Sequence, residues 1–196
     1  MTRQELKSMA KQQIQGNIGV IFVINLIVYA ISVLAGVIPV VGSVASVVIA
    51  PAFSLSLTMV YLSLTRGIQA QISDAFAGFQ DLWTAFKTTF LVGLFTMLWS
   101  LLFCIPGIIK AISYSQAMFI VAENPGISAL EAIDRSKAMM DGHKMDYFVM
   151  GLSFLGWEIL GAFTFGLLYI WLVPYMQTTY ANFYNSIKPG AETPAE

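Results

Sequence analysis

The residue with the most unusual chemistry in this sequence is Glu158, a carboxylate within the otherwise uncharged stretch 147–187. A charged side chain at the centre of a bilayer costs about 2.5–3.5 kcal/mol on insertion scales, so we expect Glu158 to face protein or water. Such a carboxylate can carry protons or bind a substrate, or it can stay protonated and hydrogen-bond between helices. The second interpretation is favoured, because this stretch holds no other charge.

Polar and small residues are the expected surroundings of Glu158. Lys110 is a candidate partner if it turns toward the protein, and small residues such as Gly161 on the same face would let another helix approach closely. A polar stripe is expected on the last helix, formed by Tyr175, Thr178, Asn182 and Asn185. The candidate membrane site comprises Glu158, Lys110, Tyr175, Gln177, Asn182, Pro106, Gly107 and Trp157.

Enzyme chemistry is not indicated elsewhere. His143 has no nearby Cys or His to complete a metal site, and no catalytic triad order or phosphate-binding glycine loop occurs. We therefore predict a chain that is not an enzyme and has no catalytic residues, cofactor or metal. The net charge of -1 lacks the excess of Lys and Arg that nucleic acid binding requires, so no nucleic acid partner is expected.

Composition and charge indicate a membrane protein. Hydrophobic residues make up 57% of the chain and charged residues 11%, about half the usual charged share. Basic residues are retained on the cytoplasmic side of bacterial membrane proteins. Six crossings starting from the cytoplasm would place one basic residue, Lys110, outside. The other nine would be inside: Arg3, Lys7, Lys11, Arg66, Lys87, Arg135, Lys137, Lys144 and Lys188.

The charge-free runs predict an all-α fold of six transmembrane helices arranged as three hairpins. The expected spans are 17–34, 44–64, a segment of 88–109 that ends at Pro106 and Gly107, 107–122, and two within 147–187 that divide around Gly166. The fourth span is short, but Lys110 can extend its lysine stem to the interface. Omitting it would move three basic residues outside.

An amphipathic helix along the cytoplasmic interface is expected before each hairpin. The clearest carries apolar residues at helical spacing: Ile72, Phe76, Phe79, Trp83 and Phe86. Ser128 with Glu131, and less strongly Thr2 with Glu5, predict helix starts with capping boxes. These helices either cover the membrane bundle or sense lipids, and the pattern does not distinguish the two.

The second helix of each hairpin indicates an internal repeat. Segments 51–61, 113–123 and 174–184 begin 62 and then 61 residues apart, and Tyr114 and Gln116 match Tyr175 and Gln177. We predict one domain over 1–188 with pseudo-repeats at about 1–65, 66–124 and 125–188, followed by a disordered tail at 189–196.

Several motifs resemble the DUF975 family of bacterial membrane proteins: 98–110 (LWSLLFCIPGIIK), 113–115 (SYS), 123–125 (ENP), 136–140 (SKAMM), 154–157 (FLGW) and 174–175 (PY). This family is similar to the membrane domain attached to some glycerophosphodiester phosphodiesterases. The resemblance implies a bacterial inner-membrane protein with six helices and an association with lipid or envelope processes, and it supplies no catalytic residues. Glu158 departs from the apolar residue expected after the 154–157 motif.

Two functions are therefore weighed. The first is a non-catalytic protein of the bacterial cytoplasmic membrane with both termini inside, which assembles with membrane lipids, further copies of itself or other membrane proteins. The alternative is a small transporter or lipid-translocating protein that uses Glu158 as its buried carboxylate. A polar cavity that reaches Glu158 would favour the alternative.

Overall fold

The computed structural model describes residues 2–37, 41–102, 104–164 and 167–190, and every regular element within these ranges is a helix. The chain begins with α1 (Arg3–Gln13), followed by α2 (Ile18–Val37) and α3 (Val41–Thr65). The predicted capping box is confirmed, because the Thr2 N–H donates to the Glu5 carboxylate at 2.7 Å and the Glu5 N–H donates to the Thr2 hydroxyl at 3.3 Å. Gly16, with φ of 85°, lies in the turn where α1 and α2 meet at 88°.

The segment predicted as the second interfacial helix is a 3₁₀ helix, η1 (Ile72–Asp81), which continues directly into α4 (Leu82–Leu102). Phe79 packs edge-on against Phe53 of α3, with ring centroids 5.0 Å apart. Gly78 makes this packing possible: its N–H donates to the Ser56 hydroxyl at 2.8 Å, and a Cβ at this position would lie 2.2 Å from the Ala52 carbonyl oxygen. The segment therefore covers α3, while Ile72 and other apolar residues stay exposed.

The predicted fourth span consists of two helices, α5 (Cys104–Tyr114) and α6 (Ala117–Glu123). A tertiary contact stabilises the break between them, because Ser136 of α7 (Ala129–Met139) accepts a hydrogen bond from the Gln116 N–H at 3.1 Å and donates to the Ser113 carbonyl at 2.8 Å. Ser128 caps α7 by accepting from the Glu131 N–H at 3.2 Å, but the Glu131 side chain pairs with Arg135 and does not complete the predicted capping box.

The predicted fifth span is likewise interrupted. It forms α8 (Lys144–Leu152) and α9 (Leu155–Phe163), separated at Ser153 and Phe154, and α10 (Tyr169–Ile187) follows. Phe154 lies at this interruption and is fully buried in a cluster with Leu6 of α1 and Met150 of α8. The predicted division at Gly166 lies outside the described residues.

Three helical segments within the described ranges are long and apolar enough to cross a membrane, namely Val47–Thr65, Ile72–Leu101 and Ile105–Glu123. A fourth is added if the bent pair Arg3–Gln13 and Ile18–Val33 forms one span. The prediction of six spans is therefore supported only in part. The shortfall has a physical cause, because α8 and α9 have nine residues each and α10 is interrupted by polar residues such as Gln177 and Asn182.

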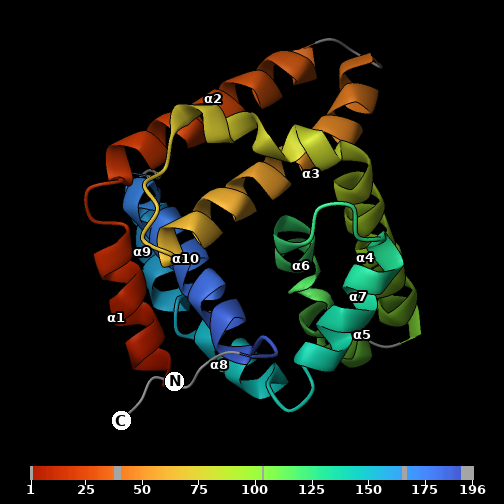
Figure 1. Cartoon of the computed structure of the whole chain (residues 1–196). Helices are drawn as coiled ribbons and strands as arrows, with labels where there is room; N and C mark the ends of the chain where they lie inside the picture. The colour runs from red at the N-terminus through yellow and green to blue at the C-terminus, as the bar shows by residue number, and fades with distance from the viewer. Residues whose placement is uncertain (1, 38–40, 103, 165–166, 191–196) are drawn as a thin grey trace.

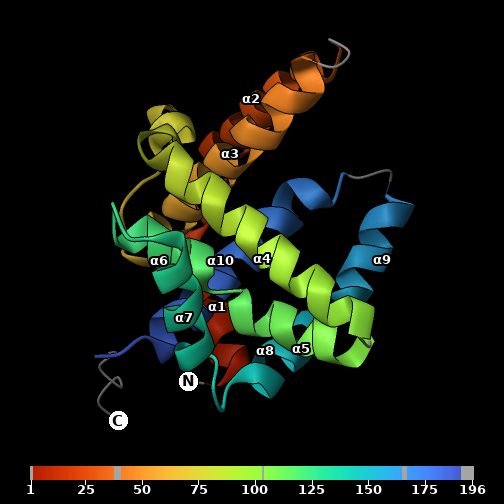
Figure 2. The same cartoon turned by 90° about the vertical axis from the view of Figure 1, so that its right-hand side faces the viewer.

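Helix α3 lies at the centre of the packing and contacts α2, η1, α4, α6 and α10 (Figure 1). Figure 2 shows the antiparallel α2–α3 pair directed away from α1, α7 and α8, while α4 and α5 run side by side in a different direction. The main apolar core follows α3 and α6 and includes Leu55, Tyr61, Ile120 and Val121.

The amphipathic segments α1, η1 and α7 precede α2–α3, α4–α6 and α8–α10, respectively. The internal repeat and the single domain over 1–188 stay predictions. Of the predicted disordered tail, Pro189 and Gly190 form a turn after α10, and 191–196 lies outside the described residues.

Candidate functional site

Charged residues meet where α3, α6 and α10 end. Glu123 is the last residue of α6, and its side chain is only 16% exposed. Its Oε1 atom forms ion pairs with Arg66, just beyond α3, and with Lys188, just beyond α10, the latter at 3.0 Å. Its Oε2 atom accepts a hydrogen bond from the Tyr184 hydroxyl at 2.7 Å. We call these four residues the helix-end cluster.

The helix-end cluster joins the ends of α3, α6 and α10 through one carboxylate. Glu123 receives two cations and one hydroxyl, and Phe119 stacks on Tyr184 with ring centroids 5.3 Å apart. The two cations are partly exposed, with side-chain exposures of 47% for Arg66 and 33% for Lys188. The cluster is thus anchored on its acidic side and open to solvent or a ligand on its basic side.

A second polar layer links α10 to α1 and to α3. The Asn182 amide donates to the Gln13 side-chain oxygen at 2.8 Å, and the Asn185 amide donates to the Thr65 hydroxyl at 2.7 Å. Lys7 lies 4.0 Å from the Phe154 ring centroid, and partial burial lowers the pKa of its ammonium below the ordinary value. The amphipathic helix α1 is therefore attached to the helical bundle by side-chain contacts.

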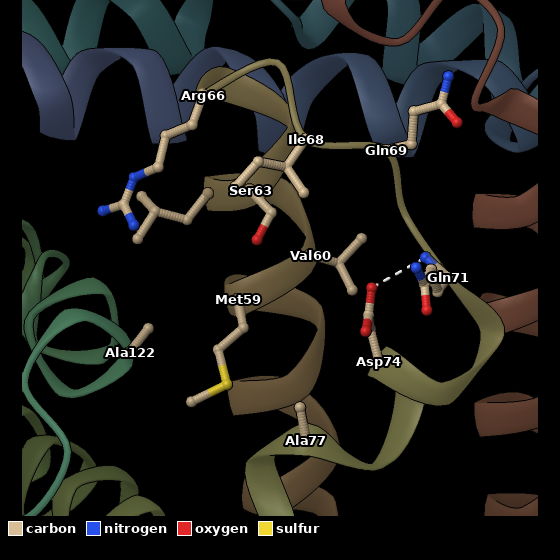
Figure 3. Close-up of a pocket in the computed structure, with 11 residues that line it drawn as sticks. Met59, Val60, Ser63, Arg66, Ile68, Gln69, Gln71, Asp74, Ala77 and Ala122 are labelled. Atoms are coloured by element: carbon tan, nitrogen blue, oxygen red, sulfur yellow. Dashed lines mark hydrogen bonds between the residues drawn. The ribbon is translucent and has the colours of Figure 1, made fainter.

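A cavity of about 410 Å³ lies between α3, η1 and the connection that joins them (Figure 3). Polar side chains line one part of it, including Ser63, Arg66 and Gln69, and apolar side chains such as Met59 and Ala77 line another. Figure 3 shows Arg66 and Asp74 on opposite sides of α3, with the Arg66 guanidinium pointing away from Asp74.

A hydrogen bond from a nearby backbone N–H positions the Asp74 carboxylate. Its Oδ2 atom accepts a hydrogen bond from the Gln71 N–H at 2.8 Å at the start of η1. A carboxylate offers about four lone-pair sites, so the other oxygen remains able to accept from a ligand. Arg66 also has unused hydrogen-bonding capacity. One of its nitrogens donates to Glu123, and the guanidinium carries five N–H donors in total.

A second cavity, of about 630 Å³, lies on the other side of Glu123. Its lining includes Arg135, His143, Tyr184 and Lys188. His143 is exposed. Across the described part of the chain, no group of three or more His, Cys, Asp or Glu side chains could hold a metal ion.

Glu158 lies outside both cavities. It is half-buried in the first turn of α9, and its backbone carbonyl accepts a hydrogen bond from the Tyr169 hydroxyl at 2.9 Å. Gly161 packs against the Tyr169 ring so closely that a Cβ there would lie 2.9 Å from it, which agrees with the predicted close approach of a neighbouring helix. Lys110 does not join Glu158, because its ammonium lies 4.6 Å from the centroid of the Trp99 ring.

Pro106 and Gly107 lie in the first turn of α5 and do not form the break itself, since α4 already ends at Leu102. Gly107 is buried, and a Cβ there would lie 2.1 Å from the Ser100 hydroxyl oxygen. The role of Gly107 is thus to let α4 and α5 pack closely.

The remaining predicted site residues are spread along α9 and α10. Trp171 of α10 stacks on Tyr175 at 4.9 Å between ring centroids and lies 6.5 Å from the ring of Trp157 on α9. Gln177 is exposed beside a small cavity of about 110 Å³ that Asn25 of α2 also lines. The structure therefore does not gather the predicted residues into one site.

The sequence interpretation missed the helix-end cluster as a site. Glu123 ends the second repeat segment, in the register of Tyr184, which ends the third. Arg66 and Lys188 were counted only for their charge. The available signal was that polar residues recur where each second helix ends.

The fold and this site define an all-helical protein with helices apolar enough to cross a membrane and a polar cluster that joins three helix ends. The family described as "Protein of unknown function (DUF975)" matches residues 1–113 and 102–191. The chain belongs to the DUF975 family. No curated protein and no solved structure matches it.

Proposed function

We propose that this chain is a non-catalytic, multi-pass protein of the bacterial cytoplasmic membrane that binds membrane lipids and supports assembly of envelope proteins. In this proposal the three hairpins supply six crossings, the interrupted segments α5–α6 and α8–α9 each count as one crossing, and both termini are cytoplasmic. The amphipathic segments α1, η1 and α7 then lie at the cytoplasmic interface.

The helix-end cluster is the observation that supports this proposal most. It brings Arg66, Glu123 and Lys188 together where α3, α6 and α10 end, and this agrees with a common cytoplasmic location of the basic residues. Large apolar side chains are exposed along other parts of the same hairpins, for example Tyr29 at 68%, Met97 at 61% and Phe163 at 79%. An exposed apolar surface of this kind is compatible with hydrocarbon as the surrounding solvent.

The proposal is tested by purifying the tagged full chain from bacterial membranes and identifying the lipids and proteins that remain bound by mass spectrometry. Retained phospholipid together with a stoichiometric membrane protein, or with a second copy of the chain, is the expected result. A monomer that retains neither lipid nor protein would contradict the proposal.

The alternative, a small transporter or lipid-translocating protein, depends on access to Glu158. Neither cavity beside Glu123 is lined by Glu158, so the geometry favours the assembly role. Vesicles that contain the purified chain and a fluorescent phospholipid separate the two functions. The assembly role predicts that an impermeant quencher reaches only the outer-leaflet lipid, whereas Glu158-dependent loss of the inner-leaflet signal would establish translocation.

A further inference from the structure

We propose that two adjoining cavities between α2, α3 and α10 bind an uncharged lipid whose headgroup is a free hydroxyl group. This inference rests on the proposed function and assigns a ligand class to the protein's lipid binding. It is supported by an unused hydrogen-bond donor in one cavity, by the apolar lining of the other, and by the lack of charge in the described lining of both.

The smaller of the two, which we call the polar cavity, has a volume of about 110 Å³, enough for a few water molecules. Its polar lining comes from all three helices, namely from Asn25 of α2, from Ser54, Thr58 and Tyr61 of α3, and from Gln177 of α10. The α3 residues belong to Val47–Thr65, a segment apolar enough to cross a membrane. Polar side chains within such a segment face protein or a polar cavity, so this cavity is suited to a small polar group.

Tyr61 supplies the polar cavity with an unused hydrogen-bond donor. The residue is only 3% exposed, and among the described residues its hydroxyl accepts from the Asn25 amide at 3.5 Å but donates to no group. A tyrosine hydroxyl can donate as well as accept, and buried polar groups are usually satisfied. The Asn25 amide nitrogen also donates to the Ile21 carbonyl, and its side-chain oxygen can still accept. A ligand hydroxyl can therefore accept from Tyr61 and donate to the adjacent Asn25.

The larger of the two, the apolar cavity, has a volume of about 560 Å³ and adjoins the polar cavity, because Asn25 and Val173 line both. Apart from Asn25, its lining is apolar or aromatic and comes from Phe22, Leu26 and Tyr29 of α2 and from Tyr169, Ile170, Val173 and Pro174 of α10. Leu26 and Tyr29 are exposed, so this cavity opens on the surface of the helices. An apolar chain that enters from the surrounding lipid is the ligand that this lining suits.

The order of the lining along α10 places the two parts of one ligand. Gln177 lines the polar cavity, and Tyr169, eight residues earlier and about 12 Å away along the helix axis, lines the apolar cavity. Val173 lies between them in the sequence and lines both. A lipid can therefore hold its hydroxyl in the polar cavity while its chain extends along α10.

Charge decides between a hydroxyl and an ionised headgroup. None of the described residues that line either cavity carries a charge. A phosphate or carboxylate would lose hydration there without gaining a cation, which costs far more than the transfer of a hydroxyl that forms hydrogen bonds. The two cavities beside Glu123 differ in this respect, since Arg66 lines one and Arg135 the other.

The test compares each of two alcohols with its own phosphate ester. The full chain in detergent is titrated with diacylglycerol or phosphatidic acid of identical acyl chains, and with oleyl alcohol or oleyl phosphate, and binding is followed by native mass spectrometry. We expect at least one alcohol to bind about tenfold more tightly than its phosphate, and the tighter alcohol identifies the source of the hydroxyl. Equal affinities within both pairs, or tighter binding of both phosphates, would overturn the assignment.

Two variants locate the hydroxyl and the chain. Tyr61→Phe removes the unused donor and should weaken the alcohol about tenfold. Tyr114→Phe is its matched control, because Tyr114 is similarly buried at 4% exposure but lines neither cavity. Ile170→Trp narrows the apolar cavity without adding charge and should also weaken the alcohol, whereas Ile159→Trp, at an exposed position of α9 outside both cavities, should not.

Equal alcohol affinities in Tyr61→Phe and Tyr114→Phe would refute the role of Tyr61, and equal affinities in the two tryptophan variants would refute the path of the chain. If the purified chain retains phospholipid but binds neither alcohol more tightly than its phosphate, this inference fails while the proposed lipid-binding function stands.

Discussion

Replacement of Glu123 by alanine is the perturbation that tests the helix-end cluster most strongly. The change leaves the hydroxyl of Tyr184, a residue only 3% exposed, without its acceptor, and a buried unsatisfied polar group costs about 1–3 kcal/mol. It also removes the ion pairs to Arg66 and Lys188, which are partly exposed and contribute about 0–1 kcal/mol each. We therefore expect Glu123→Ala to lower the free energy of unfolding by roughly 1–5 kcal/mol.

The assay is unfolding of the detergent-solubilised full chain, followed by tryptophan fluorescence. Glu131→Ala is a suitable control, because Glu131 is 50% exposed and pairs with Arg135 on the surface of α7, so its loss should cost about 0–1 kcal/mol. Glu123→Gln should cost less than Glu123→Ala, since the amide oxygen can still accept from Tyr184.

A double-mutant cycle isolates the contact between Glu123 and Tyr184. Tyr184→Phe and Glu123→Ala should show a coupling energy of about 1 kcal/mol or more, as expected for residues in one hydrogen-bonded network. Additive effects of the two changes, or a Glu123→Ala variant that is no less stable than Glu131→Ala, would refute the reasoning that this carboxylate joins the helix ends.

Three further predictions concern packing elsewhere. Gly78→Ala should destabilise the protein by about 1–3 kcal/mol, because the new Cβ would lie 2.2 Å from the Ala52 carbonyl oxygen. The control Gly93→Ala, in the open middle of α4, should be neutral or stabilising. Equal thermal unfolding temperatures of the two variants would contradict this prediction. Ser136→Ala should lower the free energy of unfolding by about 1–3 kcal/mol, because it leaves the Gln116 N–H without an acceptor. Ser8→Ala, at an exposed position of α1, should change it little. Unaltered hydrogen exchange near Gln116 in the Ser136→Ala variant would count against this prediction. Lys110→Met should cost about 0.5–1 kcal/mol through loss of the contact with Trp99, and an unchanged tryptophan emission spectrum would show that the contact is not formed in solution.

The sequence predicted well those helices that local composition determines. Uncharged runs interrupted by Gly and Pro located α2, α3 and the α4–α5 pair, and Thr2 with Glu5 marked the start of α1. These features depend on residues only a few positions apart, so the one-dimensional pattern contains the information needed.

Breaks that depend on distant residues were not predictable in this way. The interruption between α5 and α6 is stabilised by Ser136, twenty residues after Gln116, and the one between α8 and α9 accompanies burial of Phe154 against Leu6 of α1. Glu123 was missed for the same reason, because its partners Arg66 and Lys188 are 57 and 65 residues away along the chain. Charge counting predicted a cytoplasmic side for Arg66 and Lys188 but could not show that they meet Glu123.

Accessibility labelling of single cysteines is the most direct test of the central claim that the hairpins cross the membrane with the helix-end cluster inside. In a Cys104→Ala background, cysteines are introduced at Ser73 in η1, at Ile105 in the first turn of α5, and at Asp141 after α7, all of which are exposed positions. An impermeant thiol reagent applied to intact cells should label Ile105→Cys alone, and Ser73→Cys and Asp141→Cys should react only after the membrane is permeabilised. Labelling of Ser73→Cys and Asp141→Cys from opposite sides, or of all three from one side, would contradict this topology.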